Sequence, residues 1–128
     1  MKKERLSASI LNSFPEVDEA QVDAMLRAEI EKNDRKIIVL DDDPTGGQTI
    51  HDIRVYTDWS IDSIRRGFAE ENRIFYVLTN SRGMTETETT KVHEEIMSVV
   101  SRVSEETGKP YFYISRSDST LRGHYPLE

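Results

Sequence analysis

Apolar residues along the chain form short runs separated by polar segments, and this pattern predicts strands that alternate with helices. The run from Ile37 to Leu40 is continuously aliphatic, which is typical of a strand that is buried on both faces of a sheet. The predicted strands cover about residues 36–41, 53–57, 74–78 and 111–114.

A helix is predicted before the first strand, because apolar residues recur there every four positions, at Val22, Leu26 and Ile30. Ser13 and Glu16 have the spacing of a capping box, so we expect this helix to begin near Ser13 and to end near Asn33. The segment from Ser60 to Gly67 predicts a short second helix that the glycine ends.

A longer helix is predicted between the third and fourth strands. Thr85 and Glu88 have capping-box spacing at its start, and Gly108 stops it. Its buried face is marked by residues at helical spacing, namely Val92, Ile96, Val99, Val100 and Val103. His93 stands among charged neighbours, so we expect it to lie in solvent.

The alternation of strands and helices predicts an α/β fold, a three-layer, mainly parallel sheet of about four strands with flanking helices. We expect residues 1–35 to form an N-terminal lead and helix, and residues 36–128 to form the α/β domain. A parallel sheet needs helices on both faces, and no helix is predicted after the fourth strand. The chain therefore resembles an incomplete N-terminal domain, or one that needs a partner surface; a small domain with an irregular tail is the alternative.

The composition of the chain excludes several classes of binding partner and of metal site. The chain has 128 residues and a net charge of −7, which argues against broad binding to nucleic acid or to anionic membranes. There is no cysteine, so zinc–thiolate sites and disulfides are excluded, and the histidines lack metal-ligand spacing. The start of the chain does not resemble a signal peptide and no long apolar span is present, so we expect a cytoplasmic protein.

Three predicted strands end in segments that are rich in hydrogen-bonding side chains. These are Asp41, Asp42, Asp43 and Thr45 after the first strand, Asn80, Ser81 and Arg82 after the third, and Arg116, Asp118, Ser119 and Arg122 after the fourth. The carboxyl ends of parallel strands meet at one edge of a sheet, where ligands bind. Carboxylates suit hydroxyl groups or Mg²⁺, and arginines suit a carboxylate or phosphate, so this edge fits a small sugar acid or a sugar phosphate.

Each segment also has a purely structural interpretation. Asp-Pro-Thr-Gly is a common turn composition, and Asn80 to Gly83 could simply lead into the next helix. Arg116 and Arg122 could pair with some of the 24 acidic residues, and Asp118 could cap a helix. The expected convergence of all three segments is more specific than any one of them.

Together, these segments resemble the four-carbon acid sugar kinase family, whose members phosphorylate erythronate, threonate and 3-oxo-tetronate with ATP. The matching strings are residues 40–46, 48–52, 79–82 and 117–123, within about residues 36–128. The string Ser-Asp-Ser-Thr-Leu-Arg-Gly is the most specific of them. Gly47 and Gly83 depart from the Thr and Ser that are common in similar strings, which leaves the preferred sugar acid open.

The resemblance implies that this chain is the substrate-binding, N-terminal part of a kinase. Asp42 and Asp43 would contact substrate hydroxyls, while arginines would hold the substrate carboxylate. The candidate substrate-binding residues are Asp42, Asp43, Thr45, Asn80, Ser81, Arg82, Arg116, Asp118, Ser119 and Arg122. No residue is assigned a catalytic role and no metal ligand is expected.

The resemblance also implies ATP and Mg²⁺. The sequence contains no Gly-x-x-x-x-Gly-Lys-Ser/Thr loop, so both are expected to need a C-terminal domain that is absent from this chain. We therefore expect no phosphoryl transfer by the chain alone. The expected partners are a small sugar acid, an ATP-binding domain or partner chain, and possible further copies of this chain.

Two alternatives remain at this point. Asp41, Asp43 and Thr45 match the nucleophile loop of haloacid dehalogenase-like phosphatases, in which Asp41 would attack phosphorus with Mg²⁺ bound nearby. Gly46 departs from that pattern and no later acidic pair is evident. The second alternative is a non-catalytic fragment that only binds a small molecule.

Overall fold

The computed structural model describes residues 6–48, 50–117 and 123–128. The predicted site residues Asp118, Ser119 and Arg122 lie outside these described residues. The chain forms two compact units, Met1–Asn33 and Asp34–Glu128, and each is described by itself.

The first unit contains a 3₁₀ helix, η1 (Ala8–Ser13), and the helix α1 (Glu19–Lys32). The predicted start near Ser13 is wrong, because the Ser13 hydroxyl donates to the carbonyl of Ile10 at 2.6 Å within η1. Asp18 caps α1 instead, and its carboxylate accepts a hydrogen bond from the backbone N–H of Gln21 at 3.0 Å. The predicted end is confirmed, since Asn33 is the C-cap.

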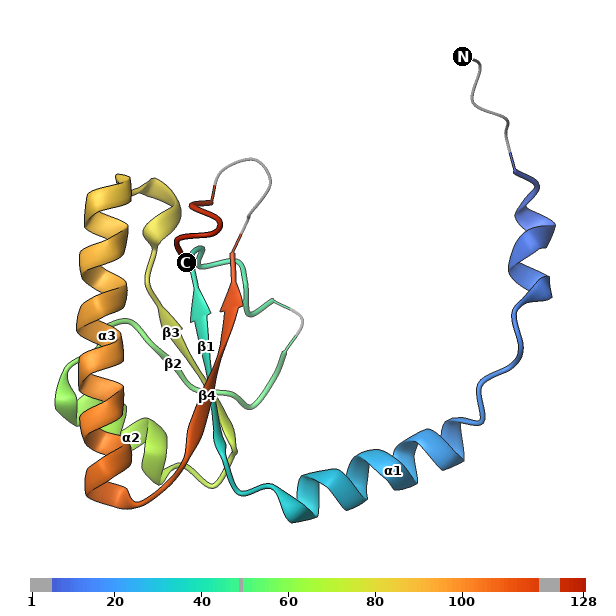
Figure 1. The fold of residues 1–128 in the computed structure, drawn as a ribbon, viewed down its shortest axis with the longest axis horizontal. Helices are drawn as coiled ribbons and strands as arrows, with labels where there is room; N and C mark the ends of the chain where they lie inside the picture. Colours follow the sequence, from blue (N-terminus) through green and yellow to red (C-terminus); the bar gives the residue numbers. More distant parts are fainter. Residues whose placement is uncertain (1–5, 49, 118–122) are drawn as a thin grey trace. The chain divides into compact units, whose positions relative to one another are not determined.

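The second unit is built on a sheet of four strands, all parallel, in the order β2-β3-β1-β4 (Figure 1). The strands are β1 (Lys36–Asp41), β2 (Val55–Tyr56), β3 (Ile74–Leu78) and β4 (Tyr111–Arg116). The predicted α/β class, with a parallel sheet and flanking helices, is confirmed. β2 is shorter than its apolar run predicts, and β4 continues two residues further.

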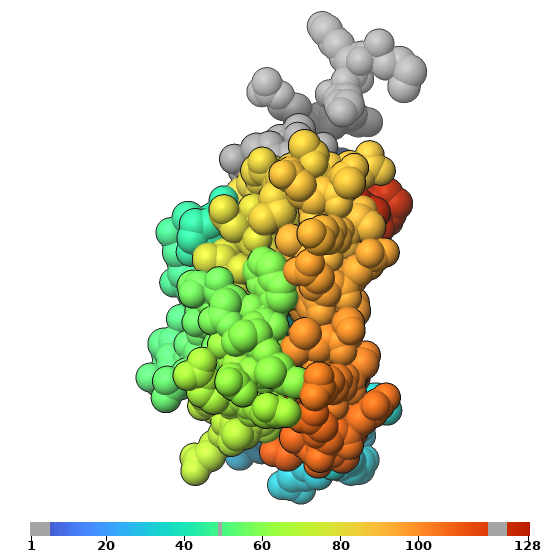
Figure 2. Space-filling model, turned by 90° about the vertical axis from the view of Figure 1, so that its left-hand side faces the viewer, coloured from blue at the N-terminus to red at the C-terminus, as the bar shows by residue number. Residues whose placement is uncertain are grey.

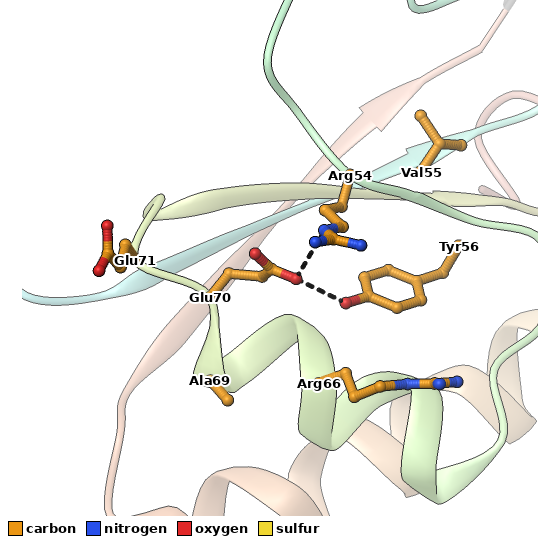
Figure 3. A pocket seen from close by; sticks show the side chains of 7 residues that line it. All are labelled: Arg54, Val55, Tyr56, Arg66, Ala69, Glu70 and Glu71. Carbon is orange, nitrogen blue, oxygen red and sulfur yellow. Dashed lines mark hydrogen bonds and ion pairs between the residues drawn. The ribbon is translucent and has the colours of Figure 1, made fainter.

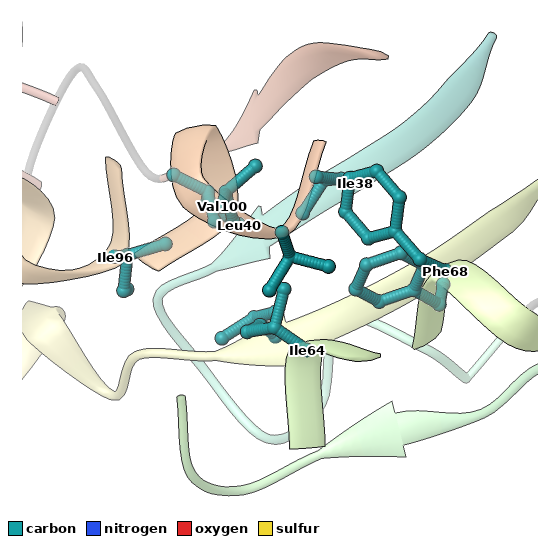
Figure 4. Close-up of a cluster of buried hydrophobic side chains, with 9 residues drawn as sticks. Ile38, Leu40, Ile64, Phe68, Ile96 and Val100 are labelled. Carbon is teal, nitrogen blue, oxygen red and sulfur yellow. The ribbon is translucent and has the colours of Figure 1, made fainter. Parts of the chain in front are cut away.

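Two helices of this unit pack on one face of the sheet. They are α2 (Ile61–Ala69) and α3 (Glu86–Thr107), which lie side by side over the strands (Figure 2). Between helices and sheet lies one core of buried side chains (Figure 4), made of Ile38, Leu40, Ile64, Phe68, Phe75, Val77, Ile96, Val100 and Val103. Alternate residues of β1 and β3 supply its sheet side, as the pleat of a strand requires.

The opposite face of the sheet is less covered at its β4 edge. There Ile37 pairs with Phe112 and Val39 pairs with Ile114. Val39 is buried, whereas Phe112 and Ile114 keep 37 % and 41 % of their surface exposed. The helices α2 and α3 both lie on the other face.

The ends of α3 are those that the sequence predicts. Thr85 and Glu88 form a reciprocal capping box, and Gly108 closes the helix in the left-handed conformation with φ of 67°. The expectation for His93 is wrong, since it is only 9 % exposed and its Nδ1 lies 2.8 Å from the carbonyl of Thr89. His93 lies between Thr89 and Ile96 along the buried stripe of the helix, so the stripe is wider than its aliphatic residues indicate.

Gly67 does not end α2, which continues to Ala69. A Cβ atom at this position would lie 2.7 Å from the Phe75 ring, so the glycine is required by close packing of helix on strand. Phe75 is fully buried, and a close-packed core leaves its ring little room to move aside.

Gly67→Ala is therefore expected to lower the free energy of unfolding by about 1–3 kcal/mol, the usual cost of overpacking a core. The better helix propensity of alanine offsets only part of this. Urea unfolding followed by the fluorescence of the single tryptophan, Trp59, measures the change. Adding Phe75→Leu to the variant should recover part of the loss; a destabilisation that ignores residue 75 would contradict this explanation.

Candidate functional site

The carboxyl ends of β1, β3 and β4 meet at one edge of the sheet (Figure 1). The backbone N–H of Thr79 donates to the carbonyl of Asp41 at 2.8 Å, and the N–H of Asp42 donates to the carbonyl of Arg116 at 3.4 Å. After β3, the short 3₁₀ helix η2 (Ser81–Gly83) follows, and the N–H of Arg82 donates to the carbonyl of Asp42. The predicted convergence of the strand ends is confirmed for these described residues.

Asp42, Asp43 and Arg82 form a charged group at this edge, here called the Asp–Arg cluster. Arg82 donates to both oxygens of Asp42, through Nε at 3.1 Å and Nη2 at 2.9 Å, and donates to Asp43 Oδ2 through Nη1 at 2.8 Å. The side chain of Asp42 is 2 % exposed and that of Arg82 is 17 % exposed. The planar guanidinium thus pairs with two adjacent carboxylates and fixes their orientation, and the cluster keeps a net charge of −1 when both are ionised.

Asp41 lies beneath this cluster and is only 3 % exposed. Burial raises the pKa of its carboxyl group, and the hydrogen bond from the N–H of Asp43 and the charge of Arg116 oppose that shift only in part. Arg116 Nη1 lies 3.9 Å from Asp41 Oδ1, and the Arg116 side chain is 45 % exposed. Arg116 is therefore a cation beside Asp41 that solvent can reach.

Thr45 and Asn80 support the site through local structure. Asp43 Oδ1 accepts hydrogen bonds from the N–H of Thr45, at 2.8 Å, and from its hydroxyl. Asn80 adopts the left-handed conformation with φ of 55°, which turns the chain from β3 into η2. Thr45 thus orients Asp43, while the contribution that the structure shows for Asn80 is its backbone turn.

Glu128 and Thr79 lie beside the candidate residue Ser81, and neither is among the substrate-binding candidates predicted from the sequence. Ser81 Oγ lies 2.6 Å from Glu128 Oε1 and 3.0 Å from Thr79 Oγ1. His124, in the same segment as Glu128, donates from Nε2 to the carbonyl of Met84 at 2.9 Å. Thr79 is the first polar residue after β3, and this position could have marked it as a candidate. No pattern in the sequence marks Glu128.

Among the described residues, no group of three or more histidine, aspartate and glutamate side chains could hold a metal ion. Asp42 and Asp43 share the guanidinium of Arg82, so their oxygens face a cation that is already present. The described part of this chain therefore does not fit a resident Mg²⁺, and its sequence has no nucleotide loop for ATP.

A separate pocket of about 550 Å³ lies between β2 and the end of α2 (Figure 3). In it, Glu70 Oε1 accepts from Arg54 Nε and from the Tyr56 hydroxyl, both at 3.1 Å. These bonds join the edge strand β2 to the end of α2. Burial, followed by the bond to Glu70, raises the pKa of Tyr56.

The family model described as a sugar-binding N-terminal domain matches residues 37–128. The chain belongs to this family. No curated protein and no solved structure matches the chain.

The matched residues include β1 from Ile37 onward, β3, β4 and the whole Asp–Arg cluster, whereas α1 lies before them. The prediction that the domain binds a sugar thus agrees with the family to which it belongs. A small sugar is the partner that fits the domain. No described helix is long and apolar enough to cross a membrane.

Proposed function

We propose that the sugar-binding domain holds a four-carbon sugar acid, such as threonate or erythronate, for phosphorylation by ATP bound on a separate domain or chain. The observation that carries this proposal is the meeting of the acidic end of β1 with Arg82 and Arg116 at one edge of the sheet. Carboxylates accept hydrogen bonds from sugar hydroxyls, and an exposed guanidinium binds a carboxylate through two parallel bonds.

The geometry supports different roles for the two arginines. The guanidinium of Arg82 holds Asp42 and Asp43, so Arg82 and the buried Asp42 together orient Asp43, the carboxylate that accepts from the sugar hydroxyls. Asp43 is the more accessible carboxylate, with its side chain 21 % exposed. Arg116 is the more exposed cation and is the residue we assign to the substrate carboxylate.

The burial of Asp41 argues against the phosphatase alternative. A phosphatase nucleophile must reach phosphorus, but Asp41 is 3 % exposed and its carboxylate lies against Gly46. Magnesium-dependent phosphatase activity that Asp41→Asn abolishes would reverse this judgement.

Titration calorimetry tests the sugar-acid site. Threonate or erythronate is expected to bind about 10–100-fold more tightly than the neutral tetritols threitol and erythritol, because a paired carboxylate contributes about 1.5–3 kcal/mol. Arg116→Ala should remove this discrimination and Arg116→Lys should keep part of it. Equal binding of acid and tetritol by the native chain would contradict the proposal.

The kinase part is tested separately. The chain alone is expected to transfer no phosphoryl group from ATP to the sugar acid, because no nucleotide site is evident in its sequence. ATP-dependent phosphorylation of threonate or erythronate by the isolated chain would show that the ATP site lies within these residues.

A further inference from the structure

The unit Met1–Asn33 has no core of its own. Every described residue of η1 and α1 is exposed, and none is buried. Nine large apolar side chains of this unit keep between 45 % and 76 % of their surface exposed. They are Leu6, Ile10, Leu11, Phe14, Val17, Val22, Met25, Leu26 and Ile30. A helix of 14 residues is only marginally stable in water, and in proteins most of its stability comes from packing an apolar face, so this unit requires a surface to pack on.

Four of these side chains form a row along α1, here called the α1 stripe. Val22, Leu26 and Ile30 recur every four residues, and Met25 lies beside them, three residues after Val22. Residues at this spacing share one side of a helix, and such a side packs against another apolar surface. Ala24 lies on the opposite side of α1. The α1 stripe therefore gives this helix one side that suits an apolar partner.

The charges of α1 favour a partner helix that runs antiparallel to it. The N-cap and the first half of α1 carry three acidic residues and no basic one, whereas the second half carries two acidic residues and both basic ones. The acids of the first half are Asp18, Glu19 and Asp23, and the bases are Arg27 and Lys32. Two parallel copies of α1 would bring the acidic first halves together, whereas antiparallel copies bring each acidic half to the bases of the other copy.

A two-fold axis at the middle of α1 matches these charges on both sides of the stripe. Asp23 and Arg27 have their midpoint at residue 25, which belongs to the α1 stripe, and Asp18 and Lys32 have the same midpoint. An axis through this point therefore pairs each acid with the base of the other copy, and symmetry repeats each pair. At about 3.6 residues per turn, the first pair flanks one side of the stripe and the second pair flanks the other. Within the chain, Lys32 pairs with Glu29 at 2.8 Å, but both side chains are exposed and this pair is weak.

We propose that the unit Met1–Asn33 is a docking surface for a second copy of this chain, with the two α1 stripes packed antiparallel. A stable interface takes about 20–30 residues from each partner, which is close to the described length of the unit, residues 6–33. An anionic membrane fits less well, because α1 and its N-cap carry five acidic residues and two basic ones. This association does not depend on sugar binding.

Sedimentation equilibrium of the full chain tests the dimer. The native chain is expected to be dimeric at about 100 µM and to dissociate on dilution, as mass action requires. Leu26→Glu places two carboxylates between the paired stripes and should weaken association by more than about 100-fold. Ala24→Glu is the matched control, because it adds the same charge to the opposite side of α1 and should change association by no more than about threefold. A native chain that is monomeric at this concentration, or equal weakening in both variants, would overturn the proposal.

A charge exchange tests the antiparallel direction. Asp23→Arg places like charges next to Arg27 of the second copy and should weaken association by about three- to tenfold, as expected for exposed ion pairs. Adding Arg27→Asp exchanges the two charges and should restore the native association. A double variant that associates no better than Asp23→Arg would overturn the antiparallel arrangement. A monomeric native chain that Leu26→Glu, but not Ala24→Glu, makes less stable to urea would mean instead that the stripe packs within one chain.

Discussion

Replacing Arg82 by alanine is expected to lower the free energy of unfolding of the unit Asp34–Glu128 by about 3–5 kcal/mol, the cost of leaving a buried charge without its partner. Asp42 is 2 % exposed and accepts two hydrogen bonds from Arg82, and Asp43 accepts a third. Without the guanidinium, two adjacent carboxylates would repel each other where water has little access. Urea unfolding monitored by Trp59 fluorescence measures the loss.

Arg54→Ala is the matched control, because it also removes an arginine that pairs with a carboxylate. Arg54 Nε lies 3.1 Å from Glu70 Oε1, but its side chain is 71 % exposed, so the expected loss is below about 1 kcal/mol. Adding Asp42→Asn to Arg82→Ala should recover stability, because it removes the buried charge. Similar losses in Arg82→Ala and Arg54→Ala would show that burial does not set the strength of the Asp–Arg cluster.

The sequence predicts the arrangement of the fold because burial leaves a repeating pattern. The aliphatic run before Asp41 and the spaced valines of α3 correspond to β1 and to the buried face of that helix. The predictions were wrong where two residues could each cap the same helix, or where a contact across the core determines which residue fits. Asp18 caps α1, although the sequence predicts Ser13 as the cap. Gly67 is required by its contact with the Phe75 ring and does not end a helix.

The candidate site was likewise predictable in part. Convergence of the three strand ends follows from a parallel sheet, so the sequence could predict which segments meet. It could not predict that Arg82 holds Asp42 and Asp43, because that depends on distances of a few ångströms. Glu128 could not be predicted either, since its place next to Ser81 depends on where segment 123–128 folds back.

Gly46→Ala is expected to have the largest effect on ligand binding among the glycine variants. A Cβ atom at residue 46 would lie 1.8 Å from Asp41 Oδ2, so either the carboxylate or the loop must move. The same loop carries Asp43 and Thr45, which are joined by hydrogen bonds. We expect binding of threonate or erythronate to weaken by more than about tenfold and stability to fall by about 1–3 kcal/mol.

Gly47→Ala is the control in the adjacent position, since a Cβ atom there meets nothing within 4 Å. Its stability should stay within about 0.5 kcal/mol of the native chain, and its affinity for the sugar acid should be unchanged. Equal losses of stability and affinity in the two variants would mean that both glycines are needed for loop flexibility, and that the contact of residue 46 with Asp41 is not the cause.

The pH dependence of stability identifies Asp41 as the group that Gly46→Ala disturbs. Burial raises the pKa of Asp41 in the folded chain, so its ionisation costs stability as the pH rises through that value. If the added methyl group displaces Asp41 toward water, the variant no longer bears this cost. The stability gap between native chain and Gly46→Ala should therefore be widest at pH values below the unfolded pKa of the carboxyl group. It should narrow as Asp41 ionises, whereas a gap that is independent of pH would place the strain elsewhere in the loop.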